Sequence, residues 1–403
     1  MPQLPTMKDR KRKIKLAFFA DILVKDFDGA SRTMFHIIER IPRDEFEVVF
    51  FCGMPPKEDI GHEVFQVPSV PIPFNSTYRL AIPMFSWFSL RKRLKAFRPD
   101  IIHIASPSPL GDFAFQYKRS RDIPVITIYH THFLSYIRYY LRPLPFLAQP
   151  AVKTVAYGQK KFYDQSSLMY IPTMQMVKEL QAFKFDTKKM KIWQRGMNHK
   201  LFNPDNRDVS YIKSITENDK PNILFASRLV WEKNLATLIR IYRLSEEKGD
   251  RYNFIIAGDG VARKSLAEKM PKAYMLGKVD HNILAVLYAS ADVFLFPSIS
   301  ETYGNVVVEA MASGCPCVIA RGGGSQSLVD HGKTGFLCSP EEESDYLSRI
   351  DQVLSDDQLR REIIENGIKY TQSLNWDTLC EAYFDDVALL VNSNKLPQDT
   401  VVL

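Results

Sequence analysis

Two acidic residues that could hold hydroxyl groups flank the expected start of a helix. An apolar run ends at Pro297, a polar loop carries Glu301, and a helix is expected from Gly304 with Glu309 inside it. The free N–H groups and the dipole of a helix N-terminus favour phosphate binding, and a glycine there lets a ligand approach the backbone closely. The pattern places Glu309 where a carboxylate could accept both hydroxyls of a ribose. Glu301 lies where it could hold hydroxyls of a sugar beyond the phosphates.

Two basic residues are a second sign of phosphate binding. Arg228 and Lys233 follow the expected strand 222–226, and the tight turn Gly258-Asp259-Gly260 follows the next expected strand. Ligands of open parallel sheets bind beyond the carboxyl ends of the strands. A bidentate guanidinium and a compact ammonium could neutralise a diphosphate there without a metal. The spacing of the two acids alone favours solvated surface side chains, but the added cations favour a ligand site.

Short apolar runs alternate with amphipathic segments of helix length in both halves of the chain. The expected strands are 14–20, 46–52, 101–105, 125–130, 222–226, 254–257, 293–297 and 317–320. The expected helices are 31–41, 87–97, 235–247, 263–270, 282–289 and 304–312. Nearly continuous apolar strands indicate parallel sheets covered on both faces. With 403 residues, the chain is expected to form two Rossmann-like α/β domains, 1–200 and 201–375, with a linker near 196–220.

The motifs of the second half resemble those of the GT-B nucleotide-sugar transferases of glycosyltransferase family 4. The matching stretches are Ser227-Arg228-Leu229 with Glu232-Lys233-Asn234, then Ala257-Gly258-Asp259-Gly260, 289–298, Glu301 with Glu309, Gly323-Gly324 and Gly332-Lys333-Thr334-Gly335. The resemblance implies two Rossmann-like domains that face a cleft. It also implies that a C-terminal helix, about 376–396 and beginning at Trp376, crosses back onto the N-terminal domain.

The same resemblance implies roles for single residues. The equivalents of Arg228 and Lys233 hold the diphosphate, that of Glu309 holds the ribose, and that of Glu301 faces the transferred sugar. Retention of the anomeric configuration is implied, with no essential metal and no cofactor besides the nucleotide-sugar co-substrate. The expected donor-binding residues are Gly29, Arg228, Lys233, Gly258, Val279, Glu301, Tyr303, Gly304, Asn305 and Glu309; the expected catalytic residues are His130, Glu301, Arg228 and Lys233.

The first half resembles the family more loosely. Asp28-Gly29-Ala30 stands where the family has a glycine-rich loop near the donor phosphates, with one glycine where many relatives have two. Tyr129-His130-Thr131-His132-Phe133 resembles the active-site histidine segment. We assign the role to His130, because it ends the expected strand; a satisfied core or loop histidine is the alternative, and a His-x-His metal site lacks further ligands.

The segment between the halves carries a further resemblance. Trp193-x-Arg195-Gly196-Met197-Asn198 resembles the interdomain segment of the family, and Asn198 is expected to cap a turn where relatives often have Asp. Two cysteines, in Cys315-Pro316-Cys317, could suggest a metal pair, but buried strand residues are the better interpretation. The sparse, odd set of five cysteines indicates reduced thiols and a cytoplasmic protein.

Basic and aromatic residues alternate over 78–98, which contains no acidic residue. Such a surface suits an anionic membrane, although a helix with an ordinary core face and a solvated basic face is equally compatible. No apolar run approaches the length of a membrane span, so the chain is expected to be soluble or peripheral at the inner face of a membrane. Without an RNA-binding motif, no nucleic-acid partner is expected.

We therefore predict a retaining hexosyltransferase that uses a UDP- or GDP-sugar and an acceptor hydroxyl, with a membrane lipid or glycan precursor as the acceptor. The alternatives are a nucleotide-sugar epimerase of the same fold and a synthase that acts on a soluble sugar phosphate or a glucan. A non-catalytic nucleotide-sugar sensor is the least favoured, because a pure binder has less need of a sugar-facing acid such as Glu301.

Overall fold

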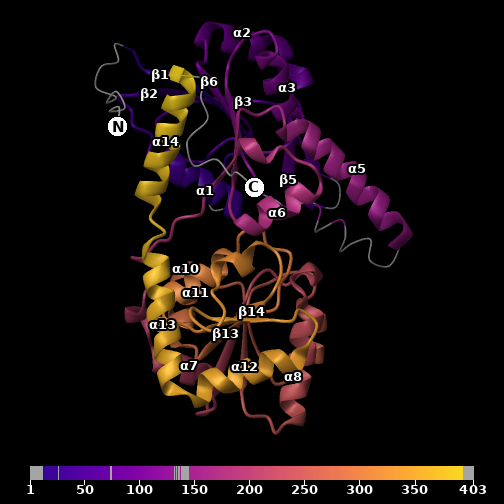
Figure 1. The fold of residues 1–403 in the computed structure, drawn as a ribbon, viewed down its shortest axis with the longest axis vertical. Coiled ribbons are helices and arrows are strands. Elements are labelled where there is room, and N and C mark those ends of the chain that lie inside the picture. The colour runs from indigo at the N-terminus through magenta and orange to yellow at the C-terminus, as the bar shows by residue number, and fades with distance from the viewer. Residues whose placement is uncertain are drawn as a thin grey trace.

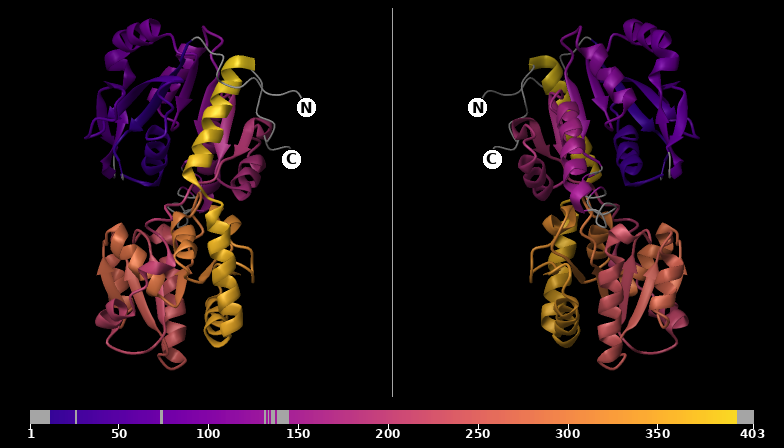
Figure 2. Two further views of the ribbon diagram at one scale, coloured as in Figure 1. Left: turned by 90° about the vertical axis from the view of Figure 1, so that its left-hand side faces the viewer. Right: turned by 90° about the vertical axis from the view of Figure 1, so that its right-hand side faces the viewer.

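The computed structural model describes residues 12–25, 27–72, 75–130, 132, 134, 137 and 145–393. Within these residues, two parallel sheets with their own helices lie one above the other along the long axis of the molecule (Figure 1). Figure 2 shows the same two units from the sides, with the C-terminal helix α14 (Trp376–Ser393) alongside the upper one. The expectation of two α/β domains with parallel sheets is confirmed.

The first sheet is built from the N-terminal half, in the order β3-β2-β1-β6-β7-β8-β9 with parallel neighbours. Its strands are β1 Ile14–Ile22, β2 Phe46–Met54, β3 Glu63–Gln66, β6 Ile101–Ile104, β7 Val125–Ile128, β8 Leu168–Ile171 and β9 Met190–Ile192. A separate antiparallel pair joins β4 Ser69–Ile72 to β5 Asn75–Ala81. Because β2 and β6 lie on opposite sides of β1, the loops after β1 and β6 border a switch point where ligands bind.

Alternation along β1 explains how both faces of this sheet are covered. Ala17 and Phe19 share a core cluster with helices α2 Trp87–Phe97, α3 Pro109–Lys118 and α6 Met174–Ala182. Leu16 and Phe18 share another cluster with helices α1 Gly29–Ile38 and α14. Helix α5 Pro145–Tyr163 adds Phe162 to the first of these clusters. The C-terminal helix therefore packs in the core of the first domain, although it lies at the other end of the sequence.

The second sheet has the order β12-β11-β10-β13-β14-β15, again with parallel neighbours. Its strands are β10 Asn222–Ala226, β11 Asn253–Ala257, β12 Tyr274–Gly277, β13 Val293–Phe296, β14 Cys317–Ala320 and β15 Phe336–Cys338. Its helices are α7 Val209–Thr216, α8 Leu235–Glu247, α9 Arg263–Lys269, α10 His281–Ser290, α11 Asn305–Ala312, α12 Glu343–Ser355 and α13 Asp357–Gln372. Here β10 lies between β11 and β13, so the loops after β10 and β13 border the second switch point.

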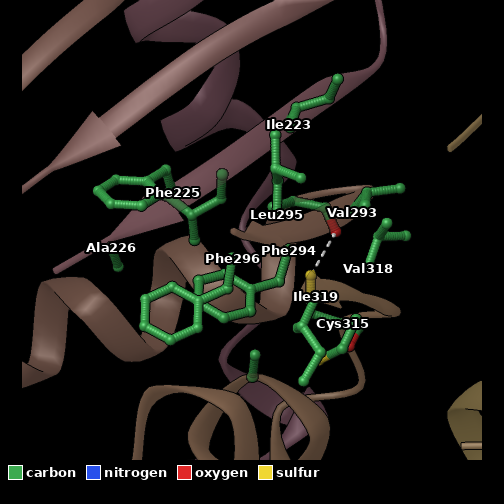
Figure 3. Close-up of a cluster of buried hydrophobic side chains, with 14 of the residues drawn as sticks. Ile223, Phe225, Ala226, Val293, Phe294, Leu295, Phe296, Cys315, Val318 and Ile319 are labelled. Atoms are coloured by element: carbon green, nitrogen blue, oxygen red, sulfur yellow. Dashed lines mark hydrogen bonds between the residues drawn. The ribbon is translucent and has the colours of Figure 1, made fainter. Parts of the chain in front are cut away.

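Buried side chains from β10, β13 and β14 pack together in the core of this domain (Figure 3). Phe294 and Phe296 of β13 stack with ring centroids 5.7 Å apart. Cys315 and Cys317 are free, buried thiols in the same core, as predicted, but only Cys317 belongs to a strand, because β14 begins there. Apolar burial on this scale fixes the strand ends, and with them the loops that carry the site.

The chain passes between the two cores twice, and the two crossings touch. Trp193 and Trp376 pack in the core of the first domain, whereas Met197 and Leu374 pack in that of the second. The Met197 N–H donates to the Leu374 carbonyl oxygen at 2.8 Å. A Cβ atom at Gly196 would lie 2.5 Å from Cγ of Trp376. These paired segments form the connection between the domains.

The expected elements agree with the structure to within a few residues. The bounds of α2, α8, β10 and β14 are as predicted, whereas α1 spans Gly29–Ile38 in place of the expected 31–41. Most of the unexpected elements are short strands, such as the edge strand β3, and helices α3, α6, α12 and α13. The expected linker 196–220 contains α7, which packs Ile212 into the second core. Asn198 accepts a hydrogen bond from the Leu201 N–H at 3.3 Å, as expected of a turn cap.

Some expectations lie outside the described residues: Thr131 and Phe133 of the histidine segment, and residues 394–396 of the C-terminal helix. Among the helices of the described part, none is long and apolar enough to cross a membrane.

Candidate active site

The loops after β10 and β13 meet at the second switch point through an ion pair. Nζ of Lys233 lies 2.5 Å from Oε1 of Glu301, and the Ser298 hydroxyl donates to the same oxygen at 2.8 Å. The Asn234 side-chain amide donates to the Pro297 carbonyl oxygen at 3.0 Å and so ties the two loops together. The cation expected at the diphosphate and the acid expected at the sugar are thus direct partners.

Glu301 is held in its ionised form by its neighbours. Burial alone would raise the pKa of this carboxyl, but the Lys233 ammonium, the Ser298 hydroxyl and the charge of Arg228 together bring the pKa below its ordinary value. A carboxylate that stays charged is a strong hydrogen-bond acceptor. Glu301 can therefore accept hydrogen bonds from hydroxyl groups of a bound sugar.

Glycines without room for a side chain support the Glu301 loop. A Cβ atom at Gly324 would lie 1.9 Å from the Thr302 carbonyl oxygen, and the Gly324 N–H donates to the Glu301 carbonyl oxygen at 2.6 Å. Gly304, the residue before α11, has a φ of +103°, a backbone conformation that residues other than glycine rarely adopt. The loop therefore leads directly into the N-terminus of α11.

The remaining residues expected at this edge have different surroundings. The Arg228 side chain is 60% exposed, with its guanidinium 3.9 Å from the carboxylate of the buried Glu232. A Cβ atom at Gly258 would lie 1.8 Å from the Ser227 carbonyl oxygen, so Gly258 lets the loop after β11 pack against the loop that carries Arg228. Val279 follows β12 and packs against the second core. Gly258 thus has a supporting contact, and Arg228 presents a largely exposed guanidinium at this edge.

Glu309 lies buried on α11 and is approached from the other domain. Burial raises the pKa of its carboxyl, while the charge of Arg32 and the Tyr288 hydroxyl act in the opposite direction. Nη1 of Arg32 lies 3.9 Å from Oε1 of Glu309 and 2.9 Å from Nε2 of His281. Since Arg32 belongs to α1, the first domain contacts the acid that is expected to hold the ribose.

The N-termini of α1 and α11 face a common residue, Arg195. A Cβ atom at Gly29 would lie 3.1 Å from Nη1 of Arg195 and 3.7 Å from Nδ2 of Asn305. The Arg195 guanidinium donates to Oδ1 of Asn305 at 3.3 Å and lies 5.6 Å from the ring centroid of Tyr303. The buried Tyr303 donates its hydroxyl to the Arg195 carbonyl oxygen at 3.2 Å. The structure thus brings Gly29, Tyr303 and Asn305 together from separate motifs.

The two histidines after β7 differ in their surroundings. Within the described part of the chain, neither ring nitrogen of the buried His130 has a hydrogen-bond partner. Burial and the charge of Arg195 lower the pKa of His130 to about 3, so its ring is neutral. The His132 ring lies 2.8 Å from the Tyr129 hydroxyl and 3.0 Å from the Glu179 carboxylate. His130 therefore has ring nitrogens available for a ligand, and His132 is held by protein groups.

Two family models cover most of the chain. Residues 27–201 match the model described as Glycosyltransferase Family 4, and residues 208–370 match the model described as Glycosyl transferases group 1. The chain belongs to glycosyltransferase family 4. The prediction of a glycosyltransferase is thereby confirmed.

Similar proteins match most of the length of this family 4 glycosyltransferase. The GDP-mannose-dependent alpha-mannosyltransferase of Corynebacterium glutamicum is 28% identical over 96% of this chain and 92% of that protein. The sulfoquinovosyl transferase of Arabidopsis thaliana is 30% identical over 83% of this chain and 64% of that protein. The structure of sucrose-phosphate synthase from Thermosynechococcus elongatus has a TM-score of 0.73 at 19% identity, over 94% of this chain and 99% of that one. The shared fold confirms the GT-B architecture.

Two arginines of this glycosyltransferase were missing from the residues expected at the site. Arg32 lies three positions after Gly29 in α1, and Arg195 lies in the interdomain segment. The signal for Arg195 was its position, because a segment that crosses between two domains must pass their shared cleft. No comparable signal marked Arg32, since its contact to Glu309 depends on how the two domains face each other.

Proposed function

We propose that this glycosyltransferase moves a hexosyl group from a UDP- or GDP-sugar to an acceptor hydroxyl with retention of the anomeric configuration. The observation that carries the proposal is the buried Lys233–Glu301 pair, which joins the loop after β10 to the loop that begins α11. It places a cation for phosphate and an ionised acid for sugar hydroxyls at one switch point. The GDP-mannose dependence of the relative from Corynebacterium glutamicum supports a nucleotide-sugar donor.

The donor diphosphate binds Arg228, Lys233 and the N-terminus of α11. These groups stabilise the negative charge that develops on the leaving phosphate, as preorganised donors and cations do in other enzymes. The bond from the sugar C1 to the phosphate oxygen breaks and its electron pair stays on that oxygen. The acceptor oxygen forms the new bond to C1 on the same face, and its proton passes to the leaving phosphate. The products are the glycoside and the nucleoside diphosphate.

Two polar residues hold the transferred sugar rather than attack it. Glu301 is already occupied by the Lys233 ammonium and the Ser298 hydroxyl, which makes it an acceptor for sugar hydroxyls and a poor nucleophile. His130 is neutral and buried, so one ring nitrogen can donate to the sugar and the other can accept. No metal or cofactor is needed for these steps, because the cations and the helix terminus supply the positive charge.

We propose a membrane lipid as the acceptor and the cytoplasmic face of an anionic membrane as the place of the reaction. Met84, Phe85 and Phe88 are exposed around the start of α2, beside the exposed Lys92 and Lys95. The opposite face of the helix packs into the core through Leu90, Leu94 and Phe97. An ordinary solvated basic face would not need three large apolar side chains in water, which favours an interfacial surface.

A thermal-shift screen with UDP, GDP and ADP tests the donor class. A ligand that binds the folded state raises the unfolding temperature by mass action, so the correct base should stand out. With the matching nucleotide sugar and a panel of lipid acceptors, NMR of the product should show the donor's anomeric configuration. An epimer formed from the donor alone would replace this proposal with the epimerase. No shift with any nucleoside diphosphate would contradict it.

A further inference from the structure

Arg195 is a half-buried cation at the junction of the two domains. Its guanidinium donates to the Asn305 side-chain oxygen at 3.3 Å and stacks on the Tyr303 ring. In the part of the chain that the structure describes, no carboxylate forms an ion pair with it. Charges withdrawn from water are normally paired with an opposite charge. Arg195 is therefore placed to pair with a bound anion.

The surroundings of Arg195 contain both positive and negative charge, but none of the acidic groups forms an ion pair with it in the described part of the chain. Gly29 begins α1 and Asn305 begins α11, and both lie against the guanidinium. A helix N-terminus carries a partial positive charge, although at α1 the Asp28 carboxylate already accepts from the Ser31 N–H at 2.8 Å. Burial, with a smaller contribution from the charge of Arg32, lowers the pKa of Arg195 to about 10. Tyr303, Asp28 and Glu301 act to raise this pKa. The residue remains charged at neutral pH, and the first residues of two helices lie beside its guanidinium.

His130 provides an independent observation at this place. It is 9% exposed, and within the described residues both of its ring nitrogens are unpartnered. It lies close enough to Arg195 for the guanidinium charge to contribute to its lowered pKa. Buried polar groups in folded proteins are usually hydrogen-bonded, so both ring nitrogens of His130 retain the capacity to bind a ligand. A ligand with a phosphate for Arg195 and a hydroxyl for His130 would satisfy both residues.

We propose that Arg195 is a third cationic ligand of the donor diphosphate and contacts the phosphate that is linked to the sugar. This inference rests on the proposed function, in which Arg228 and Lys233 bind the diphosphate from the second domain. Arg195 and the Gly29 terminus of α1 bind it from the side of the first domain. As the bond to C1 breaks, Arg195 keeps its proton and stabilises the charge on the leaving oxygen. The diphosphate thereby bridges the two domains.

Calorimetric titration of Arg195→Gln tests the inference without relying on turnover. Gln keeps a side-chain donor for Asn305 and removes the charge. We expect about tenfold or greater loss of affinity for UDP or GDP and for inorganic pyrophosphate, because charge-assisted bonds to phosphate are strong. Affinity for the corresponding nucleoside monophosphate should change less than about twofold, since the contact is to the second phosphate. Arg195→Lys should retain an intermediate affinity.

The matched control is Arg40→Gln. Arg40 is also half-buried and lies in the turn just after α1, but its guanidinium pairs with Asp377 of α14 at 2.6 Å. Its replacement should leave all three affinities unchanged. A purely structural role of Arg195 would weaken monophosphate and diphosphate binding alike, and that result overturns the inference. Full diphosphate affinity of Arg195→Gln overturns it as well.

Two further variants separate this inference from the proposed function. If Arg228→Ala and Lys233→Ala lose diphosphate affinity and Arg195→Gln does not, the function stands and the inference is wrong. If none of the three loses affinity, the diphosphate site itself is wrong. Should Arg195→Gln not fold, phenylglyoxal labelling of the wild-type protein decides. Pyrophosphate should protect the peptide that contains Arg195, and equal labelling with and without pyrophosphate refutes the contact.

Discussion

Lys233 and Glu301 form an ion pair with Nζ and Oε1 2.5 Å apart, although their side chains are only 7% and 17% exposed. Two charges in such a position depend on each other, because each would otherwise lose water without gaining a partner. The pair also connects the strand ends of β10 and β13. The same contact therefore stabilises the fold and arranges the site.

Removal of one partner should cost both stability and turnover. Lys233→Met leaves Glu301 buried without its ammonium, and we expect unfolding to be easier by about 3 kcal/mol. The double variant Lys233→Met with Glu301→Gln removes both charges and should recover much of this stability. Turnover should stay low in both, because the phosphate cation is gone. Denaturant unfolding and product formation measure the two effects; equal stability of the single and double variants would contradict the coupling.

Arg228→Ala should reduce turnover with little effect on stability. The side chain is largely exposed and its guanidinium is 3.9 Å from Glu232, so it contributes little to folding. Loss of one preorganised cation at the leaving phosphate should lower kcat by about 100-fold or more. Arg251→Ala is the control, because Arg251 is similarly exposed and pairs with Asp351. Near-normal kcat for Arg228→Ala would remove it from the diphosphate site.

Gly324→Ala tests whether backbone packing positions Glu301. The new Cβ atom would lie 1.9 Å from the Thr302 carbonyl oxygen, so the loop must move. We expect a large loss of turnover with a smaller loss of stability. Gly158→Ala is the control: nothing lies within 4 Å of a Cβ there, and α5 should gain about 0.5–1 kcal/mol from the better helix former. A fully active Gly324→Ala protein would mean that the loop tolerates displacement.

The sequence predicted the fold well because buried strands and amphipathic helices dominate it. The strands β10 and β14 are continuous apolar runs, and their bounds were predicted as observed. The edge strand β3 was missed because its residues Glu63–Gln66 are half-exposed and lack an apolar run. Motifs placed Glu301, Lys233 and Asn305 at strand and helix ends. The contacts of Arg32 to Glu309 and of Arg195 to Asn305 depend on how two domains pack, and no local pattern encodes them.

Glu309 should show opposite effects on stability and on nucleotide binding. Burial raises the pKa of the Glu309 carboxyl above its ordinary value of 4.5 in the folded state. The charge of Arg32 on α1 and the Tyr288 hydroxyl on α10 oppose this shift, and Arg32 also contacts His281 of α10. A group with a raised pKa contributes stability below pH 4.5 and loses it as pH rises through the folded pKa. Glu309→Gln should therefore be more stable than the wild type at neutral pH, yet bind nucleoside diphosphates more weakly.

Arg32→Met extends this pH test. Loss of the opposing cation should raise the pKa of Glu309 further. Since the ionised carboxylate accepts the ribose hydroxyls, the fall of UDP or GDP affinity on acidification should begin at higher pH than in the wild type. Calorimetric titrations at several pH values measure the shift, and Arg40→Met, in the turn just after the same helix, provides the control. An unchanged pH profile would separate Arg32 from Glu309.

The exposed aromatic residues near the start of α2 should determine membrane binding. Phe85 and Phe88 are 69% and 87% exposed, and their replacement by Ser should leave the core contacts of Leu90, Leu94 and Phe97 intact. We expect the double variant to bind vesicles with anionic lipid at least about tenfold more weakly, since each buried aromatic contributes apolar area. Val209→Ser, an exposed apolar site of the second domain, should bind as the wild type does.

Vesicle sedimentation measures this membrane binding. A loss of vesicle binding at high salt would show the contribution of Lys92 and Lys95, because salt screens exposed charges. Equal binding of the double variant and the wild type would exclude this surface from the membrane contact.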